Sequence, residues 1–353
     1  MELGLSCVVG EDPLGDAGKP FNLDIDPGFF AYLAHDRLAE GLAPLHSAPG
    51  ERPLAERRFA VATDEKHLAL LKNDSSNGAV RYVFAHDRRG YHDRIRRRMA
   101  YDQELAAMQG WLDATDRIAL EHFRVDVPYK SKDDGTPVTE ADLAVENVLR
   151  KAIEETYPND SVIGEEGGTA GDMKSARRWI IDPIDGTKNF RRGVPIFATL
   201  IALEESGKIV AGVASAPALN TRWFARKGGG AFRDGEKISV SKVRDIALAE
   251  VCSGGVGTIA EAGLDQRFTD LCRKAARHRG FGDFWGHMLV AQGSMDVMLD
   301  PEVNIWDLAA PKIIVEEAGG TMTSISGEDR IDGGSALTTN SNLHDHVLAA
   351  LMS

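Results

Sequence analysis

The chain has 353 residues, a net charge of −13 and a pI of about 5.3. This acidic balance argues against a nucleic-acid groove as the main functional site, and three scattered cysteines are too few for a disulfide framework or a zinc site. Because the chain has neither a run of about 18 apolar residues nor a basic segment followed by an apolar core at its start, we expect a cytoplasmic protein with no membrane partner.

The first 98 residues differ in charge from the rest of the chain. They hold 14 Lys and Arg against 15 Asp and Glu, a balance of −1, which leaves 27 against 39, or −12, for the remainder. Residues 59–71 are interpreted as a helix and residues 79–87 as a strand. The basic run at residues 86–99 is typical of a solvated linker, with nucleic-acid contact as the alternative. We therefore predict an N-terminal extension, residues 1–98, of unknown role and structure.

A helical pattern begins at residue 101. Leu105, Met108, Leu112, Ala119 and Phe123 recur at three-, four- and seven-residue steps, which predicts one apolar helix face with Thr115 as its polar interruption.

A second helix is predicted to begin after Thr139, the expected N-cap, with Asp142 three residues later and Pro158 closing the segment.

The rest of the chain mixes short strands and helices. Strands are predicted at residues 161–166 and 179–181, a hairpin over 196–216 with its turn at Ser206 and Gly207, and a strand pair around 228–230. Further elements are helices near 265–276, 284–293 and 307–318, and strands near 295–299, 321–325 and 335–339. This mixture favours a layered α/β (α+β) fold.

Four acidic residues stand at the ends of these predicted elements. Glu165 ends a strand, Asp182 and Asp185 follow the next one, and Asp307 begins a helix. Taken singly, Glu165 could be a loop charge, Asp185 a turn residue and Asp307 an N-cap. Together they offer hard oxygen ligands that a scaffold could aim at one point, which suits Mg²⁺.

Gly186 and Thr187 follow the second of these aspartates directly. If a helix starts here, its free amides favour an anion such as phosphate, and Gly186 lets that anion approach the backbone. The Thr187 hydroxyl can both donate and accept hydrogen bonds, so it can hold a water molecule.

These segments resemble the inositol monophosphatase superfamily. The similarity rests on "TPVTEAD" (136–142), "GEE" (164–166), "DPIDGTKNF" (182–190), "WDLAA" (306–310) and "EAGG" (317–320), which occur in the family's order at family-like spacing over about residues 101–353. The stretches "GTKNFRRGVPIFATLIAL", "VASAPALNTRWFARKGGGAF" and "FGDFWGHMLVAQG" are most similar to the bacterial histidinol-phosphate phosphatase branch.

The resemblance implies a five-layered αβαβα sandwich over residues 99–353, divided roughly into 99–240 and 241–353, and Mg²⁺-dependent hydrolysis of a small phosphate monoester. It implies that Glu165, Asp182 and the Ile184 carbonyl hold a first ion. Asp182, Asp185 and Asp307 would hold a second, and a third would lean on Glu165, for two or three Mg²⁺ in all. It also implies a homodimer.

The same resemblance assigns the remaining site residues. Asp142 and Thr187 would orient the attacking water, and the amides of Gly186 and Thr187 would take the phosphate. Asp283 and Asp300 would face the non-phosphate end of the substrate, unless both are solvated surface acids. An acidic pair there favours histidinol phosphate, while inositol phosphate, a 3′,5′-bisphosphate nucleotide and a non-catalytic role on the same fold stay as alternatives.

One departure from the pattern concerns Pro311, four residues after Asp307. If the helix begins at Asp307, this proline lies close to the first turn, where its missing N–H costs little.

Overall fold

A computed structural model describes residues 59–64, 67–74, 79–84, 101–124, 126–132 and 137–352. By its internal contacts the chain divides into two compact units, residues 1–93 and 94–353. The basic run at residues 86–99 lies outside the described residues, so its interpretation as a linker stays a prediction. The described residues contain no helix long and apolar enough to cross a membrane.

In the first unit, the described residues form a three-stranded antiparallel sheet of β1 (Phe59–Asp64), β2 (His67–Asp74) and β3 (Ala79–Phe84). The strand predicted at 79–87 is confirmed over β3, but the helix predicted at 59–71 is wrong. The charged stretch at 64–66 divides the apolar run into two pieces of strand length, and β2 pairs with both of its neighbours. Cross-strand hydrogen bonding overrides a short stretch of helical periodicity.

The second unit contains the remaining elements. Its helices are α3 (Asp102–His122), α4 (Glu140–Thr156), α5 (Thr187–Arg191), α6 (Val256–Glu261), α7 (Asp265–Lys274), α8 (Asp283–Ala291), α9 (Ile305–Glu317) and α10 (His344–Met352), with 3-10 turns at Pro217–Leu219 and Ile246–Leu248. Its strands are β4 (Lys130–Ser131), β5 (Pro137–Val138), β6 (Ser161–Gly164), β7 (Gly168–Gly171), β8 (Arg177–Asp185), β9 (Ala198–Glu205), β10 (Lys208–Ala216), β11 (Thr221–Arg226), β12 (Gly230–Arg233), β13 (Glu236–Ile238), β14 (Glu250–Ser253), β15 (Arg277–Arg279), β16 (Val297–Asp300), β17 (Thr321–Thr323) and β18 (Ala336–Thr339).

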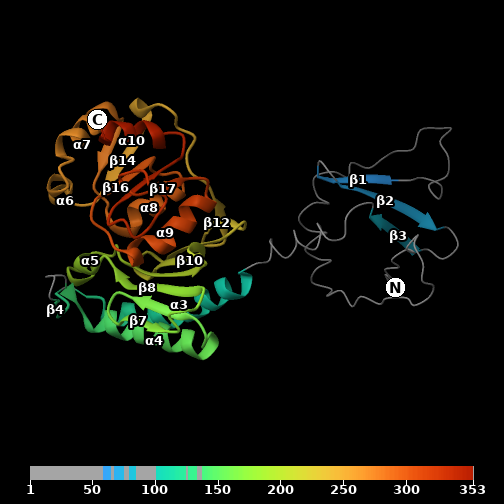
Figure 1. The fold of residues 1–353 in the computed structure, drawn as a ribbon, viewed down its shortest axis with the longest axis horizontal. Helices are drawn as coiled ribbons and strands as arrows, with labels where there is room; N and C mark the ends of the chain where they lie inside the picture. Colours follow the sequence, from blue (N-terminus) through green and yellow to red (C-terminus); the bar gives the residue numbers. More distant parts are fainter. Residues whose placement is uncertain are drawn as a thin grey trace. The chain divides into compact units, whose positions relative to one another are not determined.

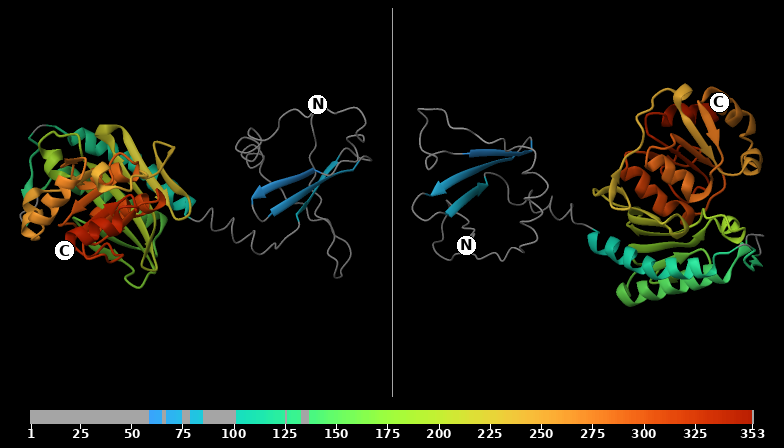
Figure 2. Two further views of the ribbon diagram at one scale, coloured as in Figure 1. Left: turned by 90° about the horizontal axis from the view of Figure 1, so that it is seen from above. Right: turned by 180° about the vertical axis from the view of Figure 1, so that it is seen from behind.

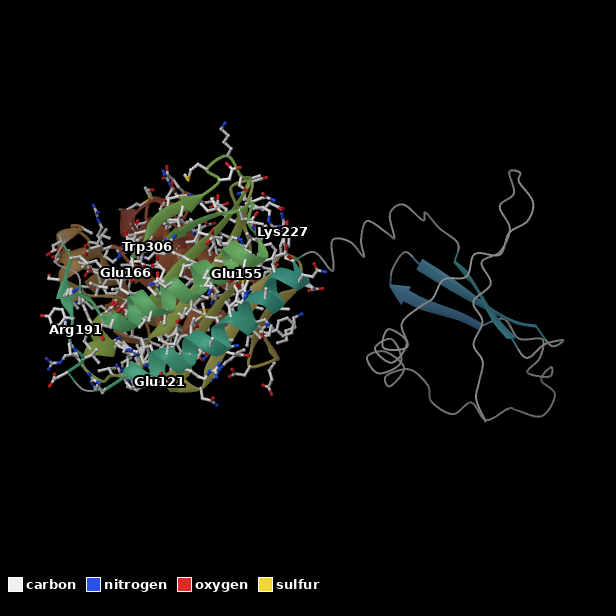
Figure 3. All side chains as sticks on the ribbon, turned by 90° about the horizontal axis from the view of Figure 1, so that it is seen from below. Glu121, Glu155, Glu166, Arg191, Lys227 and Trp306 are labelled. Carbon is white, nitrogen blue, oxygen red and sulfur yellow. The ribbon has the colours of Figure 1, made fainter. Side chains whose placement is uncertain are left out.

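These elements stack in five layers (Figure 1 and Figure 2). Helices α3 and α4 lie side by side on one face of an eight-stranded sheet of order β13-β12-β11-β10-β9-β8-β6-β7, as Figure 3 also shows. Helices α8 and α9 cover its other face and separate it from a five-stranded sheet of order β15-β14-β16-β18-β17. Helices α6, α7 and α10 form the outer layer. The predicted αβαβα sandwich is confirmed.

The first two predicted helices are confirmed as α3 and α4. Met108, Leu112, Thr115 and Ala119 are buried along one face of α3. Thr139 caps α4 in a capping box, in which its hydroxyl accepts from the first-turn amides and Asp142 accepts from the Thr139 amide. The buried carboxylate of Asp142 therefore has a local role in capping the N-terminus of the helix as well as any role in a site.

Most of the later predictions are also confirmed. The hairpin of β9 and β10 turns at Ser206 and Gly207, both with positive φ, as a tight hairpin turn requires. Strands β4, β5, β7, β13, β14 and β15 and helices α6 and α10 were not predicted. They are short, so their sequences carry little periodicity of their own.

Two elements that matter for the site begin or end differently from the prediction. Strand β8 continues through Asp182 to Asp185, with a register shift against β9 between these residues. Helix α9 begins at Ile305, so Pro311 is its seventh residue and lies inside it, not near its first turn. A proline there has no N–H for the carbonyl four residues earlier, which is the carbonyl of Asp307.

Close packing sets the position of α9 over the large sheet. A Cβ on Gly212 of β10 would lie 2.8 Å from Cγ2 of Ile313 and 3.0 Å from Cα of Ala310. Only glycine leaves room for the helix backbone at this distance from the strand. The helix that carries Asp307 is therefore held directly against the sheet that carries Asp182 and Asp185.

Candidate active site

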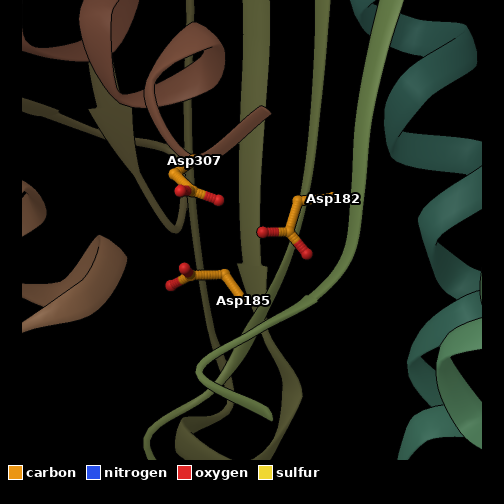
Figure 4. A group of neighbouring side chains, drawn as sticks. All are labelled: Asp182, Asp185 and Asp307. Carbon is orange, nitrogen blue, oxygen red and sulfur yellow. The ribbon is translucent and has the colours of Figure 1, made fainter. Parts of the chain in front are cut away.

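Three carboxylates from two elements converge at the end of β8. Asp182 and Asp185 come from β8, and Asp307 comes from the first turn of α9, as Figure 4 shows. One oxygen atom from each of the three lies within 4.8 Å of the others. The exposed fraction of Asp182 is 2% and that of Asp185 is 8%. The structure thus brings together three of the four acidic residues that the sequence singled out.

Backbone amides hold two of these carboxylates in place. The amide of Phe284, in the first turn of α8, donates to Oδ2 of Asp185 over 2.7 Å. The amide of Asn304 donates to Oδ2 of Asp307 over 2.7 Å, in a capping box. Asp307 is therefore the third residue of its helix, and Asn304 is the N-cap. Each bond leaves the second oxygen of the carboxylate available to another ligand.

Asp182, Asp185 and Asp307 are called the triad below. Burial and mutual repulsion dominate its electrostatics. Burial, and then the charges of Glu165, Asp185 and Asp307, raise the pKa of Asp182 well above its usual value. The pKa of Asp185 is raised in the same way by burial and by Asp283 and Asp307. Burial raises the pKa of Asp307 to about 6, although the Asn304 amide opposes the shift. A cluster of this kind ionises fully only when a cation neutralises it.

The donor set fits a hard divalent metal ion. Oδ1 of Asp182 is buried and has no hydrogen-bond partner among the described residues, although a buried carboxylate oxygen normally has one. Among the described residues, the atoms that gather here as possible ligands are carboxylate oxygens of Asp182, Asp185 and Asp307, which are the ligands that hard cations prefer. The orphaned oxygen and the raised pKa values both indicate a cluster shaped for a cation.

Glu165 lies in the turn between β6 and β7, near the triad but outside it. Its Oε1 forms an ion pair of 2.6 Å with Nζ of Lys132, which also reaches Oε1 of Glu166 over 2.6 Å. The charge of Glu165 still contributes to the raised pKa of Asp182 and Asp307. A metal ion that uses Glu165 as a ligand would therefore compete with the ammonium group of Lys132.

Thr187 and Asp142 meet beside the triad. The Thr187 hydroxyl donates to the carbonyl of Ile184 over 2.9 Å and lies 3.4 Å from Oδ1 of Asp142. Burial, opposed by hydrogen bonds from Thr139, raises the pKa of Asp142 to about 6. Gly186, at φ 80°, caps the short helix α5 that begins at Thr187, so the predicted helix start is confirmed.

Asp283 and Asp300 line a pocket that opens from the triad. Its lining consists of Asp185, Asp283, Phe284, His287, Asp300, Glu302, Val303 and Asp307. Burial, and then the charge of Asp283, raise the pKa of Asp300 to about 7. Burial raises the pKa of Asp283, while Lys188 and a hydrogen bond from Asn189 oppose the shift. The interpretation of these two residues as solvated surface acids is therefore wrong.

Sequence reasoning missed three residues around this site. Lys132 precedes the "TPVTEAD" stretch, and its pairing with Glu165 depends on the β4–β5 hairpin. His287 is buried in α8, four residues after Asp283, with Nδ1 2.8 Å from the Thr338 hydroxyl. Glu302 lies two residues after Asp300, in the loop that leads to α9. The spacing of His287 from Asp283 was the only available signal, and it is weak without knowledge of the pocket.

Comparison with known proteins agrees with this geometry. A family model described as the inositol monophosphatase family matches residues 101–353. The histidinol-phosphatase of Mycobacterium tuberculosis is 44% identical over 259 residues, which cover 72% of this chain and 99% of that protein. The histidinol-phosphatase of Streptomyces coelicolor is 43% identical over 249 residues, covering 68% of this chain and 93% of that protein.

A solved structure, the Thermotoga maritima IMPase, is similar in fold. It superposes with a TM-score of 0.65 at 31% sequence identity, over 71% of this chain and 97% of its own. The sequence motifs, the five layers and the carboxylate cluster therefore agree with one another. The chain is a phosphoric monoester hydrolase, and it belongs to the inositol monophosphatase family.

Proposed function

We propose that this phosphatase hydrolyses L-histidinol phosphate to L-histidinol and phosphate, with Mg²⁺ as its cofactor. The carboxylate-lined pocket beside the triad carries the proposal. Asp283, Asp300 and Glu302 line it beyond the residues assigned to metal, and none of its described lining residues is a lysine or arginine. The similarity to two histidinol-phosphatases points to the same substrate.

The charge of this pocket favours a cationic leaving alcohol. Histidinol phosphate has an ammonium group next to the phosphate-bearing carbon and an imidazole beyond it. Inositol phosphate offers only hydroxyl groups, and a bisphosphate nucleotide would bring a second anion towards Asp300 and Glu302. A charge-assisted hydrogen bond is worth about 1.5–3 kcal/mol, which corresponds to at least tenfold discrimination between substrates.

The proposed metal ligands combine the three clustered aspartates with positions that the family resemblance implies. Glu165, Asp182 and the Ile184 carbonyl would hold one Mg²⁺, and Asp182, Asp185 and Asp307 a second. A third would lean on Glu165. When bound, such ions supply a water of lowered pKa and stabilise the leaving oxygen.

The chain's own groups position the reactants. The Thr187 hydroxyl, fixed between the Ile184 carbonyl and Asp142, would hold the attacking water. Asp142 would accept the proton that this water loses. The amides of Gly186 and Thr187 would bind the phosphate oxygens. Glycine is required at position 186 because φ is positive and a Cβ would lie 3.0 Å from the Ile196 carbonyl.

A substrate panel tests the proposal. It compares kcat/KM for L-histidinol phosphate, inositol 1-phosphate, fructose 1,6-bisphosphate and adenosine 3′,5′-bisphosphate in the presence of Mg²⁺. We expect the highest value for L-histidinol phosphate. More efficient hydrolysis of any of the other three would overturn the substrate assignment and leave the phosphatase assignment in place. No Mg²⁺-dependent phosphate release from any of the four would favour the non-catalytic alternative.

We also infer a homodimer, from the family resemblance. Light scattering tests this, with an expected mass of twice 38.3 kDa. A mass of 38.3 kDa at catalytic concentrations would contradict it.

A further inference from the structure

The turn that carries Glu165 is held by two side chains of α4. Glu165, Glu166 and Gly167 connect β6 to β7, whose pairing closes at Gly164 and Gly168. Oε2 of Glu146 accepts a hydrogen bond from the Glu166 amide over 2.8 Å, and its Oε1 accepts one from the Gly167 amide over 2.7 Å. The two amides that follow Glu165 are thus bound to one carboxylate.

Arg150 completes this arrangement one turn further along α4. Its Nε lies 2.6 Å from Oε1 of Glu146, and its Nη2 donates to the carbonyl of Gly168. On the other side, the amide of Glu165 itself donates to the Ile181 carbonyl of β8 over 3.2 Å. The backbone before and after Glu165 is therefore fixed by α4 and by β8.

Glu146 and Arg150, here called the Glu146–Arg150 clamp, lie so close to the turn that the glycines around Glu165 are needed. A Cβ on Gly164 would lie 2.5 Å from Oε1 of Glu146, and a Cβ on Gly167 would lie 2.8 Å from Nε of Arg150. Neither glycine has a positive φ, so the requirement is for space. The charged pair and the turn are thus packed as one unit.

Burial makes this pair more than a surface ion pair. Glu146 has an exposed fraction of 2%, and three donors satisfy its carboxylate. A buried carboxylate that accepts several hydrogen bonds holds its donors in a defined geometry. Asp142 lies four residues before Glu146 on the same helix, so one face of α4 reaches both Thr187 and the Glu165 turn.

We propose that Glu146 and Arg150 are positioning residues that hold Glu165 in the geometry required for metal binding. They set the affinity for the ions that use Glu165 without contacting the metal or the substrate. This inference rests on the proposed function, in which Glu165 is a metal ligand. Partners behind the direct ligands typically change metal affinity by about 10- to 100-fold when they are removed.

The test measures metal binding to the full-length protein without substrate. Mg²⁺ is titrated by calorimetry into the wild type and into Glu146→Gln, Arg150→Met, Glu165→Gln and Glu155→Gln. Glu155 is the matched control, because it faces Lys151 in an i,i+4 pair on the exposed side of the same helix. Thermal melting of each metal-free variant and the Mg²⁺ dependence of phosphate release are measured in parallel.

We expect Glu146→Gln to weaken Mg²⁺ binding about tenfold or more and to raise the half-saturating Mg²⁺ concentration for activity by the same factor. Its kcat at saturating Mg²⁺ should fall by less than threefold, and Glu155→Gln should behave as the wild type. A lowered melting temperature with unchanged Mg²⁺ affinity would mean a purely structural role and would overturn the inference. If Glu146→Gln does not fold, the Mg²⁺ affinity of Arg150→Met tests the inference instead, because that variant keeps the Glu146 carboxylate.

Glu165→Gln distinguishes the positioning role of Glu146 and Arg150 from the metal-binding role of Glu165. If it weakens Mg²⁺ binding and the clamp variants do not, the positioning role is wrong and the metal role of Glu165 stands. If Glu165→Gln leaves Mg²⁺ binding unchanged, the metal assignment itself fails, and the positioning inference fails with it.

Discussion

The hydroxyl of Thr187 lies 3.4 Å from Oδ1 of Asp142, a residue 45 positions earlier in the chain. The same hydroxyl donates to the Ile184 carbonyl, so it joins the first turn of α4 to the end of β8. Thr187→Val keeps the shape of the side chain and removes this hydroxyl. We expect kcat to fall about 100-fold with KM little changed, because positioned proton transfer contributes about 10²–10⁴ to rate.

Thr156→Val is the matched control for that change. Thr156 is exposed near the end of α4, and its hydroxyl also donates to a carbonyl, that of Ala152. It should keep wild-type kinetics, and Thr187→Ser should restore much of the activity. A Thr187→Val enzyme with more than a third of the wild-type kcat would contradict the water-orienting role.

Asp182→Asn should remove more activity than any other single change among the metal-assigned residues, since Asp182 belongs to both inferred metal sites. We expect less than a tenth of the wild-type kcat in a phosphate-release assay. The same substitution should raise the melting temperature of the metal-free protein, because it removes a buried carboxylate whose pKa is raised by burial and by three neighbouring carboxylates. Asp270→Asn, at a half-exposed position of α7, should change neither quantity.

Loss of activity together with a lower melting temperature would indicate a folding defect instead. Retention of more than a tenth of kcat would refute the assignment of Asp182 as a shared ligand.

The stability of the metal-free protein should depend on pH through Asp300, whose pKa in the folded state is about 7. Below about pH 4 the carboxyl is protonated in both the folded and the unfolded chain, so it does not lower the free energy of unfolding. Between about pH 4 and 7 the unfolded chain ionises first, so the free energy of unfolding falls as pH rises. Asp300→Asn should therefore raise the melting temperature strongly at pH 8 and by much less at pH 4.5.

Differential scanning calorimetry in EDTA measures this shift. Glu121→Gln, on the exposed face of α3, serves as the control at both pH values. An equal effect of Asp300→Asn at pH 4.5 and pH 8 would show that ionisation of this carboxyl is not the cause.

Asp300→Asn should also change substrate selectivity. We expect kcat/KM for L-histidinol phosphate to fall at least tenfold, because a charge-assisted hydrogen bond of about 1.5–3 kcal/mol is lost. Hydrolysis of p-nitrophenyl phosphate, which has no cationic group, should change little. Equal losses for both esters would assign Asp300 to the common phosphate chemistry and not to recognition of the ammonium group.

A chain that begins at Met99 should fold and keep its catalytic activity. The family model matches residues 101–353, and contacts within the chain divide it between residues 93 and 94. Melting temperature and kcat/KM of the shortened and full-length proteins provide the comparison. Insoluble or inactive protein after truncation would mean that residues 1–98 complete the core or the site.

Much of the candidate site could be predicted from local sequence, because each proposed ligand stands near the end of an element with a clear local signal. Trp179, Ile180 and Ile181 form an apolar run of strand length, and the aspartates after them are too costly to bury without a cation. Thr139 and Asp142 form a capping box within four residues. Such features depend on neighbours in the chain, so the sequence alone determined them.

The start of α9 could not be predicted from neighbouring residues in the chain. Asp307 was expected at or near the helix N-terminus, but Asn304 is the cap, and Pro311 lies well inside the helix. The packing of Gly212 against Ala310 and Ile313 stabilises a helix whose proline costs it a hydrogen bond. That compensation comes from a strand about 100 residues away.

Only the tertiary structure decided which groups face one another across the layers. Lys132 pairs with Glu165, and the Glu146–Arg150 clamp holds the turn of Glu165, across segments that are far apart in sequence. His287 lies in the acidic pocket, although no periodic signal in the sequence marks it. The physical reason is that local sequence predicts a charged side chain to be exposed to solvent. Its burial, and hence its raised pKa and its function, arises only when another element removes water from it.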